Sequence, residues 1–274
     1  ILAVSSLSCI RSKTWSPYNL IMISLSSSRS ILHSWIILDF LMSIFCECTD
    51  CERSNSVVAN ILYMFLNCSC LWFGAWLSVF YCIKIASFTQ SFFIWMKQRI
   101  AKLVPWMLLT SWLYSFTAAI PFAWNVDGVH DNFTAPLPMT NSSASLTLLI
   151  YLCNAAMSLP LILSVVSSIL LILSLWVHTR QMQNNASGFR DASLEAHISA
   201  IKSVCSFLIL YITYYSCLIL LYSRVFSPLS DGESLCVVIM AACPTGHTMV
   251  LVWSNPKFRE LPAKIWHQTK CHIR

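Results

Sequence analysis

Long apolar segments recur along the whole chain and are separated by short polar stretches. Hydrophobic residues make up 57% of the 274 residues and charged residues only 10%, whereas about a quarter of the residues in a soluble domain are charged. A helix of about 20 apolar residues is long enough to cross a bilayer. Six segments reach that length, and the sequence therefore predicts an all-α membrane protein. They are 20–45, 57–83, 103–124, 146–176, 204–222 and 235–253.

Residues 1–10 are also apolar, but ten residues at about 1.5 Å each reach only about half-way across a bilayer. They have neither a starting Met nor a basic leader, so they do not fit a signal peptide. We interpret them as the last part of a first helix. This interpretation predicts one domain, a seven-transmembrane helix bundle followed by a tail over 255–274.

Basic residues gather on one side of this predicted topology. All but three of the 17 Lys and Arg residues lie in the connection that follows residue 10, in every second connection after that one, or in the tail. The exceptions are Arg29, Arg53 and Arg224. Cytoplasmic loops carry such an excess. The pattern predicts an amino terminus outside and a cytoplasmic carboxyl terminus. It also accounts for the net charge of +6 without a nucleic-acid partner.

Arg29 stands out because it lies near the middle of the first complete span. A charged side chain at that depth costs about 2.5–3.5 kcal/mol even on lenient scales. Its side chain could extend toward the lipid headgroups instead, but Arg29 is about two turns from the inner end. We therefore expect a buried position with polar partners.

Six stretches carry a specific resemblance. The chain lacks the acidic-Arg-aromatic and Asn-Pro-x-x-Tyr motifs of the commonest receptor class. It is similar instead, block by block and in order, to the type 2 taste receptors, G-protein-coupled receptors that detect bitter compounds. The matching blocks are "ISLSSSR", "LSVFYCIKIASFTQ", "KLVPWMLL", "LLILSLWVHTRQMQ", "FRDASLEAHISAIKS" and "HTMVLVWSNPKF".

The resemblance implies a plasma-membrane receptor, not an enzyme, with no cofactor. Small bitter agonists would bind in the outer half of the bundle, and the receptor would activate a heterotrimeric G protein of the gustducin type, followed by calcium release. A receptor oligomer is left open, and the sequence does not identify the agonists.

The implied ligand pocket uses one face of the 57–83 helix. Tyr63, Asn67 and Leu71 follow one another at intervals of four residues and so share that face. By resemblance Asn67 is the pocket Asn, and Tyr214 matches an aromatic residue at the pocket floor. Val237 stands where the family often has an acidic or polar residue, so we do not expect this chain to anchor a cationic ligand there.

The implied inner face would contact the G protein. Residues 88–102 are basic with interleaved aromatic residues, a composition typical of a helix on an anionic lipid surface or of a partner surface. The resemblance implies both roles. The residues expected to face the G protein are Lys84, Lys97, Arg99, His178 and Arg180.

A polar and packing hub is implied around Arg29. In the family the corresponding Arg faces an Asn of the first helix, which this sequence does not contain, and the inner half of the seventh helix. We expect Ser254 and nearby carbonyls as its remaining partners, a packing role for His247, and a kink at Pro160. The complete predicted hub is Arg29, Pro160, Ser174, His247, Ser254 and Pro256.

The predicted topology decides which glycosylation and cysteine motifs lie outside the cell. Asn132 and Asn141 are glycosylation acceptors in the predicted second outer loop, whereas the Asn-x-Ser pattern at Asn67 and Asn185 falls in the membrane and in the cytoplasm. The "CECTDC" stretch has no further ligands to complete a metal site, and none is expected. Pairing among these outer cysteines is left open.

Two other functions are compatible with a chain of several membrane spans. A vomeronasal type 1 pheromone receptor has similar loops, but "FYCIKIA" and "HTRQMQ" favour the taste family. A small-solute transporter would be expected to show an internal repeat and paired intramembrane charges. The spans contain only Arg29 and Asp39, and no repeat is visible.

Overall fold

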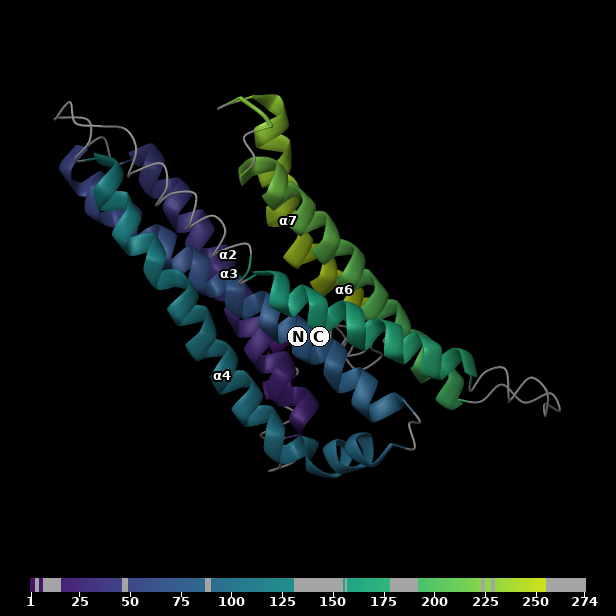
Figure 1. Cartoon of the computed structure of the whole chain (residues 1–274). Helices are drawn as coiled ribbons and strands as arrows, with labels where there is room; N and C mark the ends of the chain where they lie inside the picture. Colours follow the sequence, from purple (N-terminus) through teal and green to yellow (C-terminus); the bar gives the residue numbers. More distant parts are fainter. Residues whose placement is uncertain are drawn as a thin grey trace, which may run out of the picture.

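The fold is a bundle of long helices (Figure 1). The structure is a computed structural model that describes residues 1–2, 5–6, 16–45, 49–86, 90–130, 155, 157–177, 192–222, 225–227 and 230–254. Within these ranges six helices are long and apolar enough to cross a membrane, and no strand occurs. The predicted all-α membrane fold is confirmed. The helices are α2 (Pro17–Phe45), α3 (Thr49–Ile85), α4 (Ser91–His130), the Met157–Val177 helix, α6 (Ala192–Tyr222) and α7 (Asp231–Ser254).

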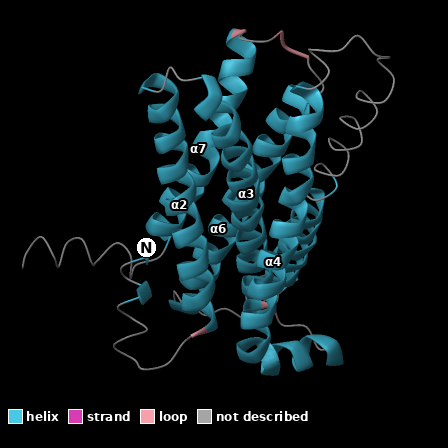
Figure 2. Cartoon of the chain, turned by 90° about the vertical axis from the view of Figure 1, so that its left-hand side faces the viewer, coloured by secondary structure: helices cyan, strands magenta, loops and turns pink. Residues whose placement is uncertain are grey.

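The helices extend beyond the apolar segments that predict them. The third helix begins at Thr49 and not at residue 57, and the fourth begins at Ser91 and not at residue 103. Hydropathy detects the part of a helix that suits lipid, whereas polar turns continue past it. Residues 91–102 of the basic, aromatic stretch thus supply the first turns of α4, which run across the bundle direction at one end (Figures 1 and 2).

Helix α3 is the central element. In the most apolar part of this helix 67% of the residues are buried, whereas the corresponding share in the other five helices is 28–33%. It packs against α2, α4 and α6, and Trp76 Nε1 donates a hydrogen bond of 2.6 Å to Ser111 Oγ on α4. Figure 2 shows α3 among the other labelled helices. The remaining helices are peripheral and expose apolar side chains such as Trp106, Met249 and Trp253, 65–79% exposed, which suits contact with lipid and not water.

Part of the first ten residues also joins the bundle. The Ser5 N–H donates to the Ile1 carbonyl at 2.9 Å, the spacing of a helical turn. Ile1 packs against the inner core of Ile21, Leu25 and Phe73.

A glycine brings α3 and α6 together. A Cβ built on Gly74 would lie 2.5 Å from the Phe207 ring, closer than side-chain atoms can approach. Phe207 is itself buried and packs against the rings of Tyr211 and His247, with centroids 5.6 and 4.8 Å away. The ring has little room to move aside, so the contact depends on the absence of a side chain at position 74.

We predict that Gly74→Ala destabilises the protein by about 1–3 kcal/mol, because the added methyl group overpacks the α3–α6 contact. Gly246→Ala is the matched control, since its Cβ would lie 3.5 Å from Leu210, an ordinary contact. That change should be neutral or stabilising by up to about 1 kcal/mol through helix propensity. Thermal unfolding of the purified protein in detergent measures both changes, and equal unfolding temperatures for the two variants would contradict the prediction.

Candidate functional site

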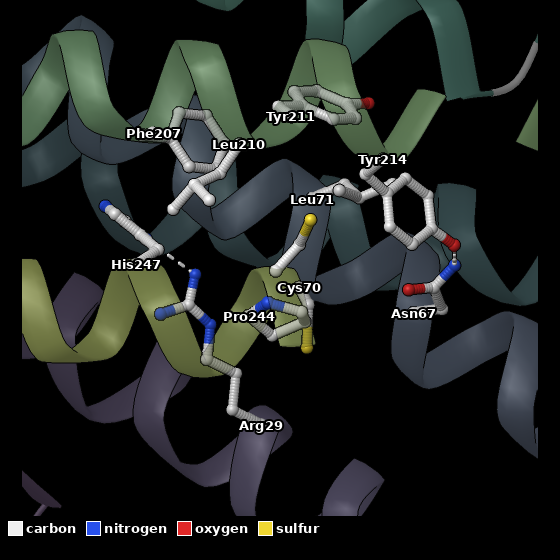
Figure 3. Close-up of a pocket in the computed structure, with 11 residues that line it drawn as sticks. Arg29, Asn67, Cys70, Leu71, Phe207, Leu210, Tyr211, Tyr214, Pro244 and His247 are labelled. Atoms are coloured by element: carbon white, nitrogen blue, oxygen red, sulfur yellow. Dashed lines mark hydrogen bonds between the residues drawn. The ribbon is translucent and has the colours of Figure 1, made fainter. Parts of the chain in front are cut away.

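A cavity lies between α2, α3, α6 and α7, near the middle of these helices (Figure 3). Its empty volume, which includes space open to the surroundings, is about 380 Å³. Most of its wall is aromatic or aliphatic, with a few polar groups. The described residues that line it are Arg29, Asn67, Cys70, Leu71, Phe207, Leu210, Tyr211, Tyr214, Cys243, Pro244 and His247.

Two residues predicted from the sequence meet at one end of the cavity. Asn67 on α3 donates a hydrogen bond from Nδ2 to the Tyr214 hydroxyl on α6, and both side chains are buried. Tyr63 packs against the core cluster that contains Tyr214. Leu71 lines the same wall one turn further along α3. Of the three residues that the four-residue spacing grouped, Asn67 and Leu71 line the cavity.

Val237 and Tyr63 are placed differently. Val237 is 53% exposed and is not among the lining residues, so the geometry gives no support for a position in this cavity. Tyr63 is half-buried, packs against the cluster that includes Leu71 and Tyr214, and is not among the lining residues. The cavity also extends along the helices, because Phe207 lies two turns before Tyr214 on α6 and His247 lies one turn after Cys243 on α7.

The opposite end of the cavity contains Arg29, which is only 6% exposed. Its Nη1 donates to Thr248 Oγ1 at 2.8 Å and its Nη2 to His247 Nδ1 at 2.7 Å, both on α7. The expected helix-seven partnership is therefore present. The partners shown are His247 and Thr248, about two turns before Ser254, the residue expected from the sequence.

The role of His247 follows from hydrogen-bond chemistry. A guanidinium can only donate, so Nδ1 of His247 must accept, and the ring hydrogen resides on Nε2. His247 is 2% exposed and packs against the Phe207 ring. The packing role expected for His247 is thus joined by a polar one.

A second contact between α2 and α7 runs parallel to the first. His33 Nδ1 bonds the Arg29 carbonyl at 2.7 Å, and its Nε2 lies 2.9 Å from Thr245 Oγ1. In the neutral ring Nδ1 donates to the carbonyl, so Nε2 accepts from Thr245. Thr248 also donates to the Pro244 carbonyl at 2.9 Å. Sequence reasoning missed Thr245, Thr248 and His33, although the polar run "TGHT" in an apolar helix was a visible signal.

Pro160, where the sequence predicts a kink, lies inside a helix. Pro160 is fully buried in the Met157–Val177 helix. A proline removes the hydrogen bond to the carbonyl four residues earlier, here residue 156, which lies outside the described residues. The neighbouring Met157 carbonyl accepts a 2.6 Å hydrogen bond from the Tyr211 hydroxyl, which ties this helix to α6 beside the cavity. Ser174 is half-buried on the same helix.

Three of the predicted G-protein-facing residues are exposed. Lys84 ends α3, while Lys97 and Arg99 lie in the first turns of α4, so the three share one end of the bundle. Lys84 Nζ lies 5.6 Å from the centroid of the Phe80 ring, and the Arg99 guanidinium 5.3 Å from that of Trp95.

Several predicted positions fall outside the described residues. They are His178, Arg180, Pro256, the acceptors Asn132 and Asn141, the beginning of the 146–176 segment and the 255–274 tail.

Comparison with known proteins identifies the family. The family model described as Taste receptor protein (TAS2R) matches residues 1–270. The chain belongs to the type 2 taste receptor family. Taste receptor type 2 member 40 of Gallus gallus is 57% identical over 281 residues, covering 100% of this chain and 90% of that receptor. Member 39 of Papio hamadryas is 37% identical, covering 98% and 81%, and member 2 of Homo sapiens is 32% identical, covering 92% and 84%.

Family membership confirms the resemblance seen in the sequence. This type 2 taste receptor is a multi-pass membrane protein and a receptor, not an enzyme. The match favours the taste family over the vomeronasal alternative and over a transporter.

We predict that Thr248→Val destabilises this taste receptor by about 1–3 kcal/mol, because it removes an acceptor from a buried guanidinium and leaves that N–H without a partner. Thr248→Ser keeps the hydroxyl and should stay within about 1 kcal/mol of wild type. Thermal unfolding in detergent and surface abundance in cells measure the effect. If valine and serine behaved alike, the hydrogen bond would not matter for stability.

Proposed function

We propose that this chain is a bitter taste receptor that binds small molecules in the α2–α3–α6–α7 cavity and activates a heterotrimeric G protein. The proposal depends most on one observation. In a chain of this family, Asn67 and Tyr214 form a hydrogen bond at one end of a mostly apolar cavity. Such a wall with few polar groups suits small ligands of varied chemistry, bound with modest affinity.

The inner end of the bundle would couple to the G protein. Exposed Lys84, Lys97 and Arg99 are one source of support, because they give this end a positive surface beside the phosphates of the inner leaflet. The helices alternate in direction, so Asp231 and Glu233 at the start of α7 lie at the opposite end. The amino terminus would then be outside, with the receptor in the plasma membrane.

Agonist binding would change the relative populations of the receptor's conformations. A ligand that prefers the state in which the inner ends of the Met157–Val177 helix and α6 separate would shift the receptor toward it. The separated ends would admit a gustducin-type G protein, and calcium release would follow.

A calcium-mobilisation screen of bitter compounds tests the proposal. Cells expressing the chain with a gustducin-type G protein should respond to at least one compound, and cells without the G protein should not. A receptor present at the cell surface that responded to no compound in a broad panel would contradict the proposal.

We predict that Asn67→Ala raises the agonist concentration for half-maximal response about tenfold or more, since it removes a central hydrogen-bonding group worth about 1–3 kcal/mol. Val237→Ala is the matched control and should leave the response unchanged, because Val237 lies outside the cavity wall. Both are measured at equal surface abundance. Unchanged potency in Asn67→Ala would remove this residue from the ligand site.

The proposed orientation has its own test. Asn132→Gln should lower the apparent mass on a gel as enzymatic deglycosylation does, because only an outer loop meets the glycosylation machinery. Asn185→Gln should change nothing. A mass shift from Asn185→Gln would reverse the proposed topology.

A further inference from the structure

The first turns of α4 carry exposed aromatic rings at one end of the bundle. Phe92 is 61% exposed and Trp95 is 45% exposed, and their rings stack with centroids 6.4 Å apart. Residues 91–102 run across the bundle direction (Figure 2), so they do not continue a spanning helix. Large apolar groups exposed together mark a contact surface, and in membrane proteins Trp is enriched at the depth of the lipid headgroups.

Basic side chains continue the same side of this segment. Residues three or four positions apart on a helix are neighbours, so Arg99 and Lys102 follow Trp95 along one side. The Arg99 guanidinium lies 5.3 Å from the centroid of the Trp95 ring, and both basic residues are exposed. We call Phe92, Trp95, Arg99 and Lys102 the aromatic-basic face.

Lys97 lies on a different side of the segment. It is only two positions from Trp95 and from Arg99, and residues at that interval do not face each other. Ile94, three positions earlier and also exposed, shares the side of Lys97. Half-buried Ile100 packs against the inner core and marks the side that meets the bundle. The segment therefore presents its cations on two separate exposed sides.

We propose that the aromatic-basic face binds the headgroup of an anionic phospholipid, and that the Lys97 side is left for the G protein. The two rings would lie among the upper acyl chains and glycerol groups, while Arg99 and Lys102 bind the phosphate. The inference rests on the proposed function and deepens it. It assigns Arg99, which the resemblance places at the G protein, to the membrane instead.

The chemistry of the face suits a phosphate. A guanidinium offers parallel N–H donors that match phosphate oxygens, and its stacking on an aromatic ring limits the freedom that binding must remove. Helix α4 has no acidic residue before Asp127, so no carboxylate on the same turns competes with the phosphate for Arg99. The cytoplasmic leaflet, where the proposed orientation places this end, is rich in anionic lipids.

The exposed rings favour lipid over a protein as the partner of this face. A G protein binds only part of the time, and each time that it left, Phe92 and Trp95 would return to water. Lipid covers the rings in every state of the receptor. An amphipathic helix with basic and aromatic residues lies in the plane of the membrane surface for this reason.

The experiment measures binding of fluorescent phosphatidylserine to the purified full chain in micelles of an uncharged detergent, followed by anisotropy. Unlabelled phosphatidylglycerol has the same net charge and a phosphate but another headgroup, and should compete about as well as unlabelled phosphatidylserine. Phosphatidylcholine, which has no net charge, should compete about tenfold more weakly. Equal competition by phosphatidylcholine, or none by phosphatidylglycerol, would overturn the proposal.

Two exposed residues give a matched pair of variants. Arg99→Gln should weaken phosphatidylserine binding about tenfold, because it removes a charge-assisted hydrogen bond. Lys97→Gln removes the same charge from the same turns but should weaken binding by about twofold or less, as a screened charge outside the site. Arg99→Lys keeps the charge without the planar donors and should recover only part of the affinity. Equal effects of Arg99→Gln and Lys97→Gln would indicate a diffuse positive surface and contradict a site.

Competition with the G protein separates the two partners. Purified G protein, added with an agonist from the calcium screen, should leave the labelled phosphatidylserine bound. Displacement of the lipid would assign the aromatic-basic face to the G protein and overturn the lipid site. The lipid measurements need no agonist, so selective phosphatidylserine binding by a chain without any calcium response would overturn the proposed receptor function alone. Calcium responses from a chain without lipid selectivity would overturn the lipid site alone.

Discussion

The buried charge of Arg29 constrains the whole arrangement of α2 and α7. A guanidinium at membrane depth is tolerated only with acceptors in reach, and Thr248 and His247 supply them from consecutive positions of α7. One turn away, His33 ties the Arg29 carbonyl to Thr245. These bonds fix both the rotation and the register of the two helices. Sliding either helix by one residue would break the whole set, so the helices move together or the charge loses its partners.

The same residues reach the cavity wall and the α3–α6 contact. Thr248 accepts from Arg29 and donates to the carbonyl of Pro244, in a part of α7 where the proline removes a backbone hydrogen bond. His247 packs on Phe207, which in turn approaches Gly74 on α3. A change in the position of Arg29 would therefore alter contacts at the Pro244 turn of α7 and at Phe207 in the cavity wall.

Local signals in the sequence predicted the helices and part of the site. Hydropathy located the six spans, and four-residue spacing placed Asn67 and Leu71 on one face of α3, which the structure shows as cavity wall. Periodicity gives faces within a helix but not how neighbouring helices are rotated. Ser254 and Val237 were expected from the resemblance to the family, which likewise does not give the rotation of each helix in this chain. The structure shows His247 and Thr248 at Arg29, and Val237 exposed to the surroundings.

The depth of the cavity has a consequence for signalling under the proposed function. Its lining residues come from two pairs of helices: α3 and α6, joined by Asn67 and Tyr214, and α2 and α7, joined by Arg29 and His247. A ligand confined to the outer half would bias only the first pair. A ligand that reaches Arg29 gains interaction energy that depends on how the two pairs sit relative to each other. Only such a difference between states can shift their populations, so ligands long enough to bridge both pairs should be the more effective agonists.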